Sequence, residues 1–248
     1  MLKFSVVTAC YNAAETVAAT LESVRRQTYP SVEHIIIDGA STDATLSTVE
    51  QYRRDGLLVV SEPDDGIGDA MNKGWALATG DFVLFLHADD VLIGDRALEM
   101  ASGHLAGGYD IVCFDVIKTS SANPAGNRCI SRPDRLALRN RMEHQGICYR
   151  RDVLERTGPF DRAFRISMDY DHLLRAVRQG MRVGKVDEVL AVMAGGGISS
   201  RTDWPGLRRR LAEERQIHLR HARGAGERLA YRLFWLAYWP FKYLRSQL

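Results

Sequence analysis

Residues 81–90 read Asp-Phe-Val-Leu-Phe-Leu-His-Ala-Asp-Asp, a continuous apolar run that ends in two carboxylates. Short apolar runs bounded by polar residues are typical of buried strands, so we expect a strand over residues 81–86. Three earlier runs, at residues 4–8, 33–38 and 57–61, have the same form. The first 90 residues therefore contain four strand candidates.

Between these runs, apolar residues return at helical spacing. The pattern predicts three helices, one ending at Arg26 and the others over residues 44–54 and 69–78. Asn12 with Glu15 resembles a capping box for the first helix. Strands that alternate with helices through short connections predict an α/β fold. We expect a Rossmann-like, mostly parallel sheet flanked by helices.

Polar side chains follow each strand candidate. They are residues 8–12 after the first, Asp38 at the end of the second, Asp64 and Asp65 after the third, and Asp89 and Asp90 after the fourth. In open parallel sheets, ligands bind beyond the carboxyl ends of the strands. The sequence therefore predicts a functional site at this edge.

The second half of the chain is less regular. Its expected elements are strands over residues 110–116, 146–149 and 183–193, and helices over residues 152–156 and 169–179 with Leu173, Leu174 and Val177 as an apolar stripe. The polar stretch 118–133 and the glycine-rich stretch 195–200 are expected to be loops. From Pro205 onward the pattern is helical, with a break near residues 224–226.

The balance of charged residues also changes near residue 200, shortly before the helical pattern of the tail begins. Residues 201–248 hold 11 Lys and Arg against 4 Asp and Glu, whereas residues 1–200 hold 22 against 27. We expect a domain over residues 1–200, with halves 1–118 and 119–200, and a basic amphipathic helical tail over 201–248. An acidic body can hold a metal, and a basic tail can meet an anionic surface.

The composition is that of a folded protein, with 46% hydrophobic and 26% charged residues in 248. None of its four cysteines lies at a metal-binding spacing, and two lie in strand-like runs. This usage indicates a reducing compartment, hence the cytoplasm. The N-terminus passes directly into a strand pattern and lacks the form of a signal peptide.

The adjacent carboxylates Asp89 and Asp90 would repel each other unless a cation or hydrogen-bond donors relieve them. Hard oxygen ligands of this kind suit Mg²⁺ or Mn²⁺, especially where substrate phosphates share the coordination. A solvated turn with Asp90 as a helix cap is an equally good reading of the pair alone. Asp38 can accept a hydrogen bond from a nucleobase N–H, or it can cap the following helix.

Asp169 is expected near a helix start, where a carboxylate can act as a general base towards a hydroxyl. Favourable pairing with the helix N-terminus is the simpler reading for Asp169 and for its rival Asp171. His144, Gln145 and Asp171 are candidate contacts on the acceptor side. A lone histidine is more often structural, and His87 is treated in the same way.

Several nucleotide-binding and hydrolase motifs are absent from the sequence. There is no P-loop, no complete G-x-G-x-x-G fingerprint and no G-x-S-x-G elbow.

Five segments occur in an order found in one family. They are Val6-Val7-Thr8-Ala9-Cys10-Tyr11-Asn12, Ile36-Ile37-Asp38-Gly39-Ala40-Ser41-Thr42-Asp43, Glu62-Pro63-Asp64-Asp65-Gly66-Ile67, Asp69-Ala70-Met71-Asn72-Lys73-Gly74 and the acidic segment 87–90. Together they resemble the family 2 glycosyltransferases, inverting enzymes with the GT-A fold. The bacterial members that build exopolysaccharide and lipopolysaccharide are the most similar. The resemblance is strong over residues 1–118 and extends to about residue 200.

The resemblance implies a nucleoside pocket formed by Ala9, Tyr11, Glu15 and Asp38, with Asp38 reading the base. It assigns residues 1–118 to binding of a nucleotide sugar and residues 119–200 to the acceptor side.

The resemblance also implies donor, metal and catalytic roles. Asp65 and Lys73 would lie beside the donor, Asp89 would approach ribose or sugar, and Asp90 would hold Mn²⁺ or Mg²⁺ on the diphosphate. Asp169 matches the catalytic carboxylate of the family.

The chain departs from the family pattern at two positions. His87 stands where Asp is frequent, so a full D-x-D is missing, and Met168 stands where Glu is frequent. The Q-x-x-R-W motif of processive synthases is absent, so we expect one sugar to be added to each acceptor.

The expected function is inverting transfer of one sugar from a nucleotide-diphosphate sugar, with UDP-sugars favoured, to a glycan or lipid-linked glycan. Divalent metal would assist and Asp169 would be the base. A sugar nucleotidyltransferase would need a Gly-rich basic loop after the first strand, where this chain has Ala9-Cys-Tyr-Asn-Ala-Ala. A non-catalytic nucleotide- or carbohydrate-binding module is the other alternative.

The tail is aromatic and basic over residues 229–244, and charged residues and Pro240 interrupt it. It is too short to span a bilayer, which takes about 20 apolar residues. Trp235 and Tyr238 beside basic residues suit an interfacial helix on the inner face of the membrane. Packing on the catalytic domain or on a homodimer partner is an equal alternative. No nucleic-acid recognition fold surrounds the basic residues.

Overall fold

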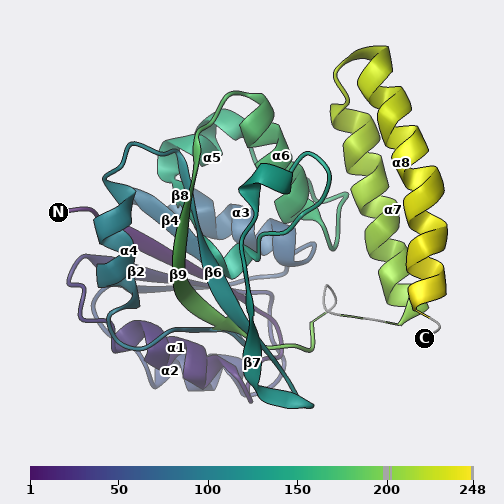
Figure 1. Ribbon diagram of the computed structural model, residues 1–248. Helices are drawn as coiled ribbons and strands as arrows, with labels where there is room; N and C mark the ends of the chain where they lie inside the picture. Colours follow the sequence, from purple (N-terminus) through teal and green to yellow (C-terminus); the bar gives the residue numbers. More distant parts are fainter. Residues whose placement is uncertain (198–200, 202, 247–248) are drawn as a thin grey trace.

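The structure, a computed structural model, describes residues 1–197, 201 and 203–246 (Figure 1). A twisted sheet with helices on both faces forms the body, and two long helices stand beside it. The predicted loop at residues 195–200 lies in part outside the described residues.

The first half forms the expected alternation of strands and helices. Its elements are β1 (Phe4–Cys10), α1 (Val17–Arg25), β2 (Val32–Asp38), α2 (Thr45–Glu50), β3 (Leu57–Ser61), α3 (Ile67–Leu77) and β4 (Phe82–Phe85). The strands pair in parallel in the order β3-β2-β1-β4. Val7, Ile36 and Phe85 are fully buried, as expected where helices cover both faces of a parallel sheet.

The second half extends the same sheet with mixed strand directions. Its elements are β5 (Val91–Leu92), α4 (Ala97–Leu105), β6 (Ile111–Ser120), β7 (Asn123–Cys129), η1 (Pro133–Arg135), η2 (His144–Gly146), β8 (Ile147–Arg150), α5 (Arg151–Thr157), α6 (Met168–Arg178) and β9 (Val183–Met193). The order continues from β4 through β8, β6 and β9 to β5. β8 is antiparallel to β4 and β6, whereas β6 and β9 are parallel. The predicted α/β fold with a mainly parallel sheet is confirmed.

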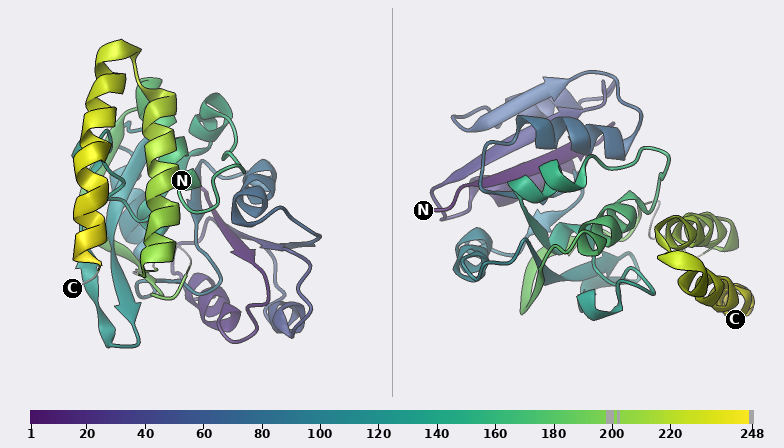
Figure 2. Two further views of the ribbon diagram at one scale, coloured as in Figure 1. Left: turned by 90° about the vertical axis from the view of Figure 1, so that its right-hand side faces the viewer. Right: turned by 90° about the horizontal axis from the view of Figure 1, so that it is seen from above.

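The tail is a helical hairpin of α7 (Trp204–His221) and α8 (Gly224–Arg245), as predicted. Figure 2 shows both helices on one side of the body. Leu211, Tyr231 and Trp235 are buried in an apolar cluster between the two tail helices. The Tyr231 hydroxyl donates to the carbonyl of Ala137 at 2.8 Å, so α8 is bound to the domain as well as to α7.

The prediction of a loop over residues 118–133 is wrong. β6 runs to Ser120 and pairs with β7 in an antiparallel hairpin. Most side chains of β7 are exposed or half-buried. A strand that buries neither face carries no hydrophobic alternation, so its sequence resembles a loop.

Two local predictions are also wrong. α1 begins at Val17 without a side-chain cap, and Asn12 has a left-handed φ of 48°. The Asn12 side chain instead accepts the backbone N–H of Thr42 at 2.9 Å, across to the loop after β2. Val177, predicted within the buried stripe of α6, is 37% exposed.

Candidate functional site

A cavity of about 630 Å³ opens where the carboxyl ends of β3 and β4 meet the second half of the chain. This size is typical of small-molecule sites. Its walls are the loop after β3, the turn after β4, η2, the start of α6 and one face of α7. The cavity brings together several residues predicted from sequence: Asp65, Asp89, Asp90, His144, Gln145 and Asp169.

The turn after β4 is held in place from α1. The Thr20 hydroxyl lies 3.3 Å from the carbonyl oxygen of His87 and 2.7 Å from that of Asp90. The Asp89 side chain is exposed, whereas Asp90 is 1% exposed. The two adjacent carboxylates therefore lie in different surroundings.

Asp90 is bound by two donors from the second half. Its carboxylate accepts the Gln145 side-chain amide at 2.7 Å and the backbone N–H of Ala194 at 3.0 Å. Burial, with a contribution from the Asp89 carboxylate, raises the pKa of Asp90 to about 7. The buried turn thus carries negative charge that two hydrogen bonds only partly offset.

A divalent cation at this turn would have to be shared with a ligand. Carboxylate oxygens are the ligands that Mg²⁺ and Mn²⁺ prefer, and a carboxylate has more lone pairs than the two donors at Asp90 use. Among the described residues, no three His, Cys, Asp or Glu side chains form a group that could hold a metal. A cation here would therefore need further ligands, such as phosphate oxygens or water.

Asp169 is the second residue of α6 and lines the same cavity. Its carboxylate accepts the N–H of Tyr170 at 2.8 Å and the Asn140 side-chain amide at 3.1 Å. Burial raises the pKa of Asp169 to about 7, and the carboxylates of Glu143 and Glu214 act in the same direction. A carboxylate with such a pKa can take up a proton near neutral pH.

Asp38 is fully buried at the end of β2. Its two oxygens accept the backbone N–H of Ser41 at 3.0 Å, the Ser41 hydroxyl at 2.5 Å and the Ser61 hydroxyl at 2.6 Å. The Cys10 thiol lies 3.7 Å away. Asp38 therefore fixes the turn at the sheet edge, and its acceptor capacity is largely used within the protein.

The other residues predicted for a nucleoside lie along the edge beyond β1 and β2, outside the cavity. Tyr11 is 63% exposed and Glu15 is exposed, whereas Ala9 is 9% exposed. A carbon added at Gly39 would lie 2.6 Å from Asp64 Oδ2 and 3.5 Å from the Tyr11 ring. Gly39 thus allows both side chains to lie close above the backbone at this edge.

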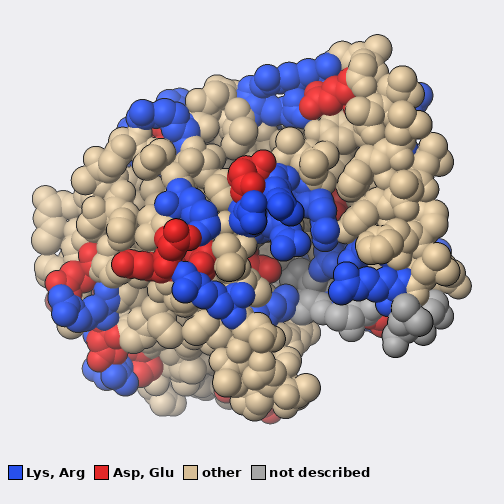
Figure 3. All heavy atoms as spheres, viewed as in Figure 1, with Lys and Arg blue, Asp and Glu red and all other residues tan. Residues whose placement is uncertain are grey.

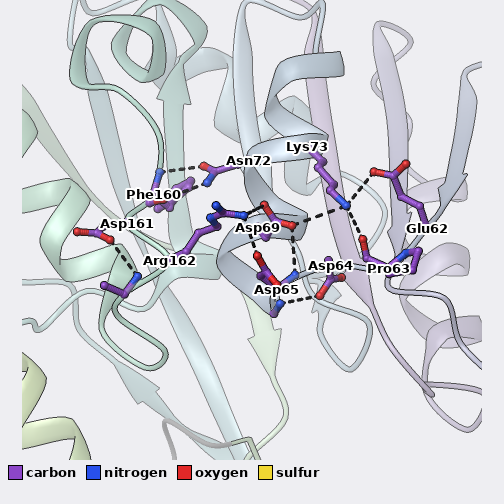
Figure 4. A network of polar contacts seen from close by, with 12 residues as sticks. Glu62, Pro63, Asp64, Asp65, Asp69, Asn72, Lys73, Phe160, Asp161 and Arg162 are labelled. Atoms are coloured by element: carbon purple, nitrogen blue, oxygen red, sulfur yellow. Dashed lines mark hydrogen bonds and ion pairs between the residues drawn. The ribbon is translucent and has the colours of Figure 1, made fainter.

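Lys73 and Asp65 belong to an ion-pair network around the loop after β3 (Figure 4). Lys73 Nζ lies 2.8 Å from Glu62 and 3.7 Å from Asp69. Arg162, from the second half, lies 3.0 Å from Asp65 and 3.1 Å from Asp69. Asp65 lines the cavity, but Lys73 supports the loop from outside it.

The prediction of Asp171 as an acceptor-side group is not supported by its position. Asp171 is 2% exposed and is not among the residues that line the cavity. Its carboxylate lies 2.7 Å from His221 and 3.5 Å from Arg175. Asp171 therefore joins α6 to α7. Because side chains two residues apart on a helix point in different directions, Asp169 and Asp171 face different surroundings.

Sequence reasoning missed Asn140 and Arg165. Asn140 binds Asp169 from a loop that carries no motif. The Arg165 guanidinium donates to the carbonyl of Asp65 and lies where a side chain at Gly66 would be. The only signal in the sequence is the glycine at position 66, which adopts a left-handed φ of 99° and indicates a tight turn rather than an arginine partner.

Comparison with known proteins gives a consistent result. The family model described as "Glycosyl transferase family 2" matches residues 5–164. A "PGL/p-HBAD biosynthesis glycosyltransferase" of Mycobacterium bovis is 34% identical over 177 residues, which are 69% of this chain and 68% of the relative.

Solved structures share the fold at lower identity. The mannosyltransferase PcManGT from Pyrobaculum calidifontis, in complex with GDP-Man and Mn²⁺, has a TM-score of 0.73 and 21% identity, over 99% of this chain and 73% of that one. S. aureus TarS has a TM-score of 0.71 and 20% identity, over 93% of this chain. The match spans only 41% of TarS, whose 1–349 fragment has been solved with UDP-GlcNAc. These likenesses show the GT-A fold.

Proposed function

Because the chain belongs to glycosyl transferase family 2 and is a glycosyltransferase, we propose that it transfers one sugar from a nucleotide-diphosphate sugar to a hydroxyl of a glycan or lipid-linked glycan, with inversion. The observation that carries this proposal is the position of Asp169. A carboxylate with a raised pKa lies in the same cavity as the acidic turn after β4.

In the proposed mechanism, Asp169 is the general base. Asn140 and the N–H of Tyr170 hold its carboxylate, and it accepts the proton of the acceptor hydroxyl as that oxygen attacks the anomeric carbon. Attack from the face opposite the leaving nucleoside diphosphate inverts the configuration. An α-linked donor would give a β-linkage.

Asp90 and Asp89 are the proposed contacts of the leaving group. Asp90 would hold Mn²⁺ or Mg²⁺, and Asp89 would contact ribose or sugar. When bound, the cation would supply positive charge that stabilises the departing diphosphate. Gln145 and the N–H of Ala194 hold the Asp90 carboxylate in one orientation, which favours a fixed ligand geometry.

The nucleoside would lie along the sheet edge beside the cavity. Tyr11 offers an exposed ring, and Asp64 links this edge to the cavity because its Oδ1 accepts the N–H of Gly66 at 2.7 Å. Asp38 would read a base N–H directly only if one of its protein donors moved. UDP-sugars remain the favoured donors.

The proposal is tested by calorimetric titration with UDP, GDP and dTDP, with and without Mn²⁺. We expect one nucleotide to bind, with Mn²⁺ strengthening binding in the wild type but not in Asp90→Asn. Asp89→Asn is the matched variant, since loss of the Mn²⁺ effect there alone would reverse the roles of the two carboxylates. No binding of any nucleotide would overturn the proposed function.

We also propose that α8 rests on an anionic membrane surface. Four leucines share one outward face of α8 and are 57–72% exposed: Leu229, Leu233, Leu236 and Leu244. Exposed arginines flank them, namely Arg228, Arg232 and Arg245. In Figure 3 the right-hand edge, where α8 lies, is largely free of charged atoms. Such a face suits the interface of anionic lipid.

This contact would be peripheral. Within the described part of the chain, no helix is long and apolar enough to cross a membrane. Glu227, the acidic residue of α8, is paired with Arg178 at 2.5 Å, so it adds little negative charge to the outer face.

A further inference from the structure

Two histidines of the cavity have ring nitrogens without hydrogen-bond partners. His144 is 6% exposed, and neither of its ring nitrogens has a partner among the described residues. His87 Nδ1 is buried and likewise lacks one. Both residues line the cavity, and their rings lie nearly parallel, with 6.0 Å between centroids and 11° between planes. Buried polar atoms in native proteins are nearly always satisfied, so a partner is expected here.

The backbone of η2, which carries His144, is held firmly in position. η2 packs against β6, where a side-chain carbon at Gly146 would lie 2.6 Å from the carbonyl oxygen of Phe114. The next residue along η2, Gln145, binds Asp90, so η2 is fixed on two sides. The His144 ring lies on the wall between this anchor and the aromatic core.

Apolar rings enclose His144 on the side away from the cavity. Its centroid lies 5.0 Å from that of Phe85 and 5.8 Å from that of Phe160. Burial lowers the pKa of His144 well below its ordinary value and also lowers the pKa of His87. Each ring is therefore neutral at physiological pH and carries one donor and one acceptor nitrogen.

The charged groups around His87 and His144 indicate which kind of ligand these two rings could bind. The turn that contains His87 also contains Asp89 and Asp90, and Asp169 lines the same cavity. Cationic side chains also line the cavity (Lys118, Arg139, Arg162, Arg165 and Arg210), but a neutral imidazole itself carries no charge that would attract an anion. A hydroxyl both donates and accepts, which matches a pair of neutral imidazoles and costs little to desolvate compared with a charge.

We propose that His87 and His144 form a binding site for a sugar hydroxyl and that this site selects which sugar the enzyme accepts. The inference rests on the proposed function and deepens it, because it identifies what one wall of the cavity recognises. A site built to bind a hydroxyl disfavours a sugar that lacks it, since the nitrogens are then left unpaired.

The test uses the full chain and His144→Phe, with UDP and GDP compared with UDP-glucose, UDP-N-acetylglucosamine and GDP-mannose by calorimetry. If the site binds the donor sugar, the variant loses about tenfold in affinity for the nucleotide sugar and keeps its affinity for the free nucleotide. If it binds the acceptor sugar, both affinities stay unchanged. The KM for methyl glycosides in a nucleotide-release assay then rises about tenfold.

His172→Phe is the matched control. His172 is a fully buried histidine whose ring centroid lies 4.6 Å from that of Phe160, and it does not line the cavity. It should change neither binding nor KM. His144→Gln, which keeps hydrogen-bonding groups, should recover part of the loss, and thermal melts check that each variant folds.

Two results would count against the proposal in different ways. The first result is that wild type binds nucleotide sugars and that His144→Phe folds and is unchanged in every affinity and KM. This result overturns this inference alone. The ring nitrogens would then be satisfied by water. Wild type that binds none of the nucleotides overturns the proposed function, and this inference with it.

Discussion

Asp38 is a fully buried carboxylate in the first half of the chain, whereas Asp169 is a half-buried carboxylate in the second, and the two differ in their hydrogen bonding. Asp38, at the end of β2, accepts three close donors from Ser41 and Ser61. Asp169, at the start of α6, accepts two, and burial raises its pKa to about 7. The first carboxylate stabilises the loops around it. The second, when ionised, lowers the stability of the fold, as is typical of catalytic groups with a raised pKa.

The same contrast holds for two walls of the cavity. In the loop after β3, the polar groups have partners within the protein: Asp64 accepts the N–H of Gly66, and Lys73 pairs with Glu62. On the opposite wall of the cavity, the ring nitrogens of His144 lack partners among the described residues. The loop after β3 is therefore a rigid support, whereas the wall that contains His144 has polar groups that a substrate could bind.

The largest expected effect is on catalysis by Asp169→Asn. Loss of the base should lower kcat by roughly 10²–10⁴-fold, whereas nucleotide affinity should change little. Asp171→Asn is the matched variant on the same helix and should retain most activity, because that side chain joins α6 to α7. Steady-state kinetics with calorimetry separates the two. Equal losses in both variants would remove the distinction between them.

The next effect is on stability at Asp38. Asp38→Ala leaves buried hydroxyl and amide donors without an acceptor and should lower the free energy of unfolding by about 3 kcal/mol. Chemical denaturation measures this, with the exposed Asp55→Ala as the control. If Asp38→Ala unfolds at the same denaturant concentration as wild type, Asp38 does not have the structural role assigned to it.

A smaller effect is expected with pH. Asp169 has a raised pKa, so the folded state binds its proton more tightly than the unfolded state, whose Asp pKa is about 3.9. The resulting stability is present at pH 4 and is lost as pH rises to 7. Activity should change in the opposite direction and fall about tenfold per pH unit below 7, because the base must be ionised.

Asp90 adds a stability term of the same sign, since burial also raises its pKa to about 7. Asp169→Asn should therefore remove only part of the slope of melting temperature against pH between 5 and 7. A slope identical to that of wild type would show that Asp169 is not desolvated in solution.

The smallest effect concerns α8. Leu236 is 72% exposed, so Leu236→Glu should leave folding and nucleotide binding unchanged. It should lower partitioning onto vesicles with anionic lipid about tenfold, because one leucine no longer enters the interface. Vesicle sedimentation measures this, with neutral vesicles as the control. A change in oligomeric state without any change in sedimentation would assign the face to a second copy of the chain.

The fold of the first half could be predicted from sequence because its strands are buried on both faces. Ile35–Ile37 form a continuous apolar run, and the strand ends were identified by the carboxylates that follow. β7 could not be predicted, since its exposed residues leave no periodic pattern. Helix starts were misjudged at Asn12, whose side chain binds a different loop. Local pattern does not determine which loop a polar residue will meet.

The cavity was predicted in part. Asp65, Asp89 and Asp90 follow strands, and the carboxyl ends of parallel strands meet at one edge of the sheet, so the sequence predicted that they lie close together. The contacts from Asn140 and Arg165 come from irregular loops, and nothing in their sequence indicates a partner. Asp90 meets Ala194, more than one hundred residues away along the chain, where β5 pairs with β9, and local sequence does not reveal this pairing.

The loop after β3 has a consequence for how the enzyme responds to its solution. Lys73 contacts this loop from the first half and Arg162 contacts it from the second; Lys73 is half-buried, and Arg162 is exposed. Exposed ion pairs weaken as ionic strength rises, whereas the buried strands behind them do not. Salt should therefore loosen one wall of the cavity while the fold stays intact. If a donor binds against this wall, its affinity should then fall as the ionic strength rises.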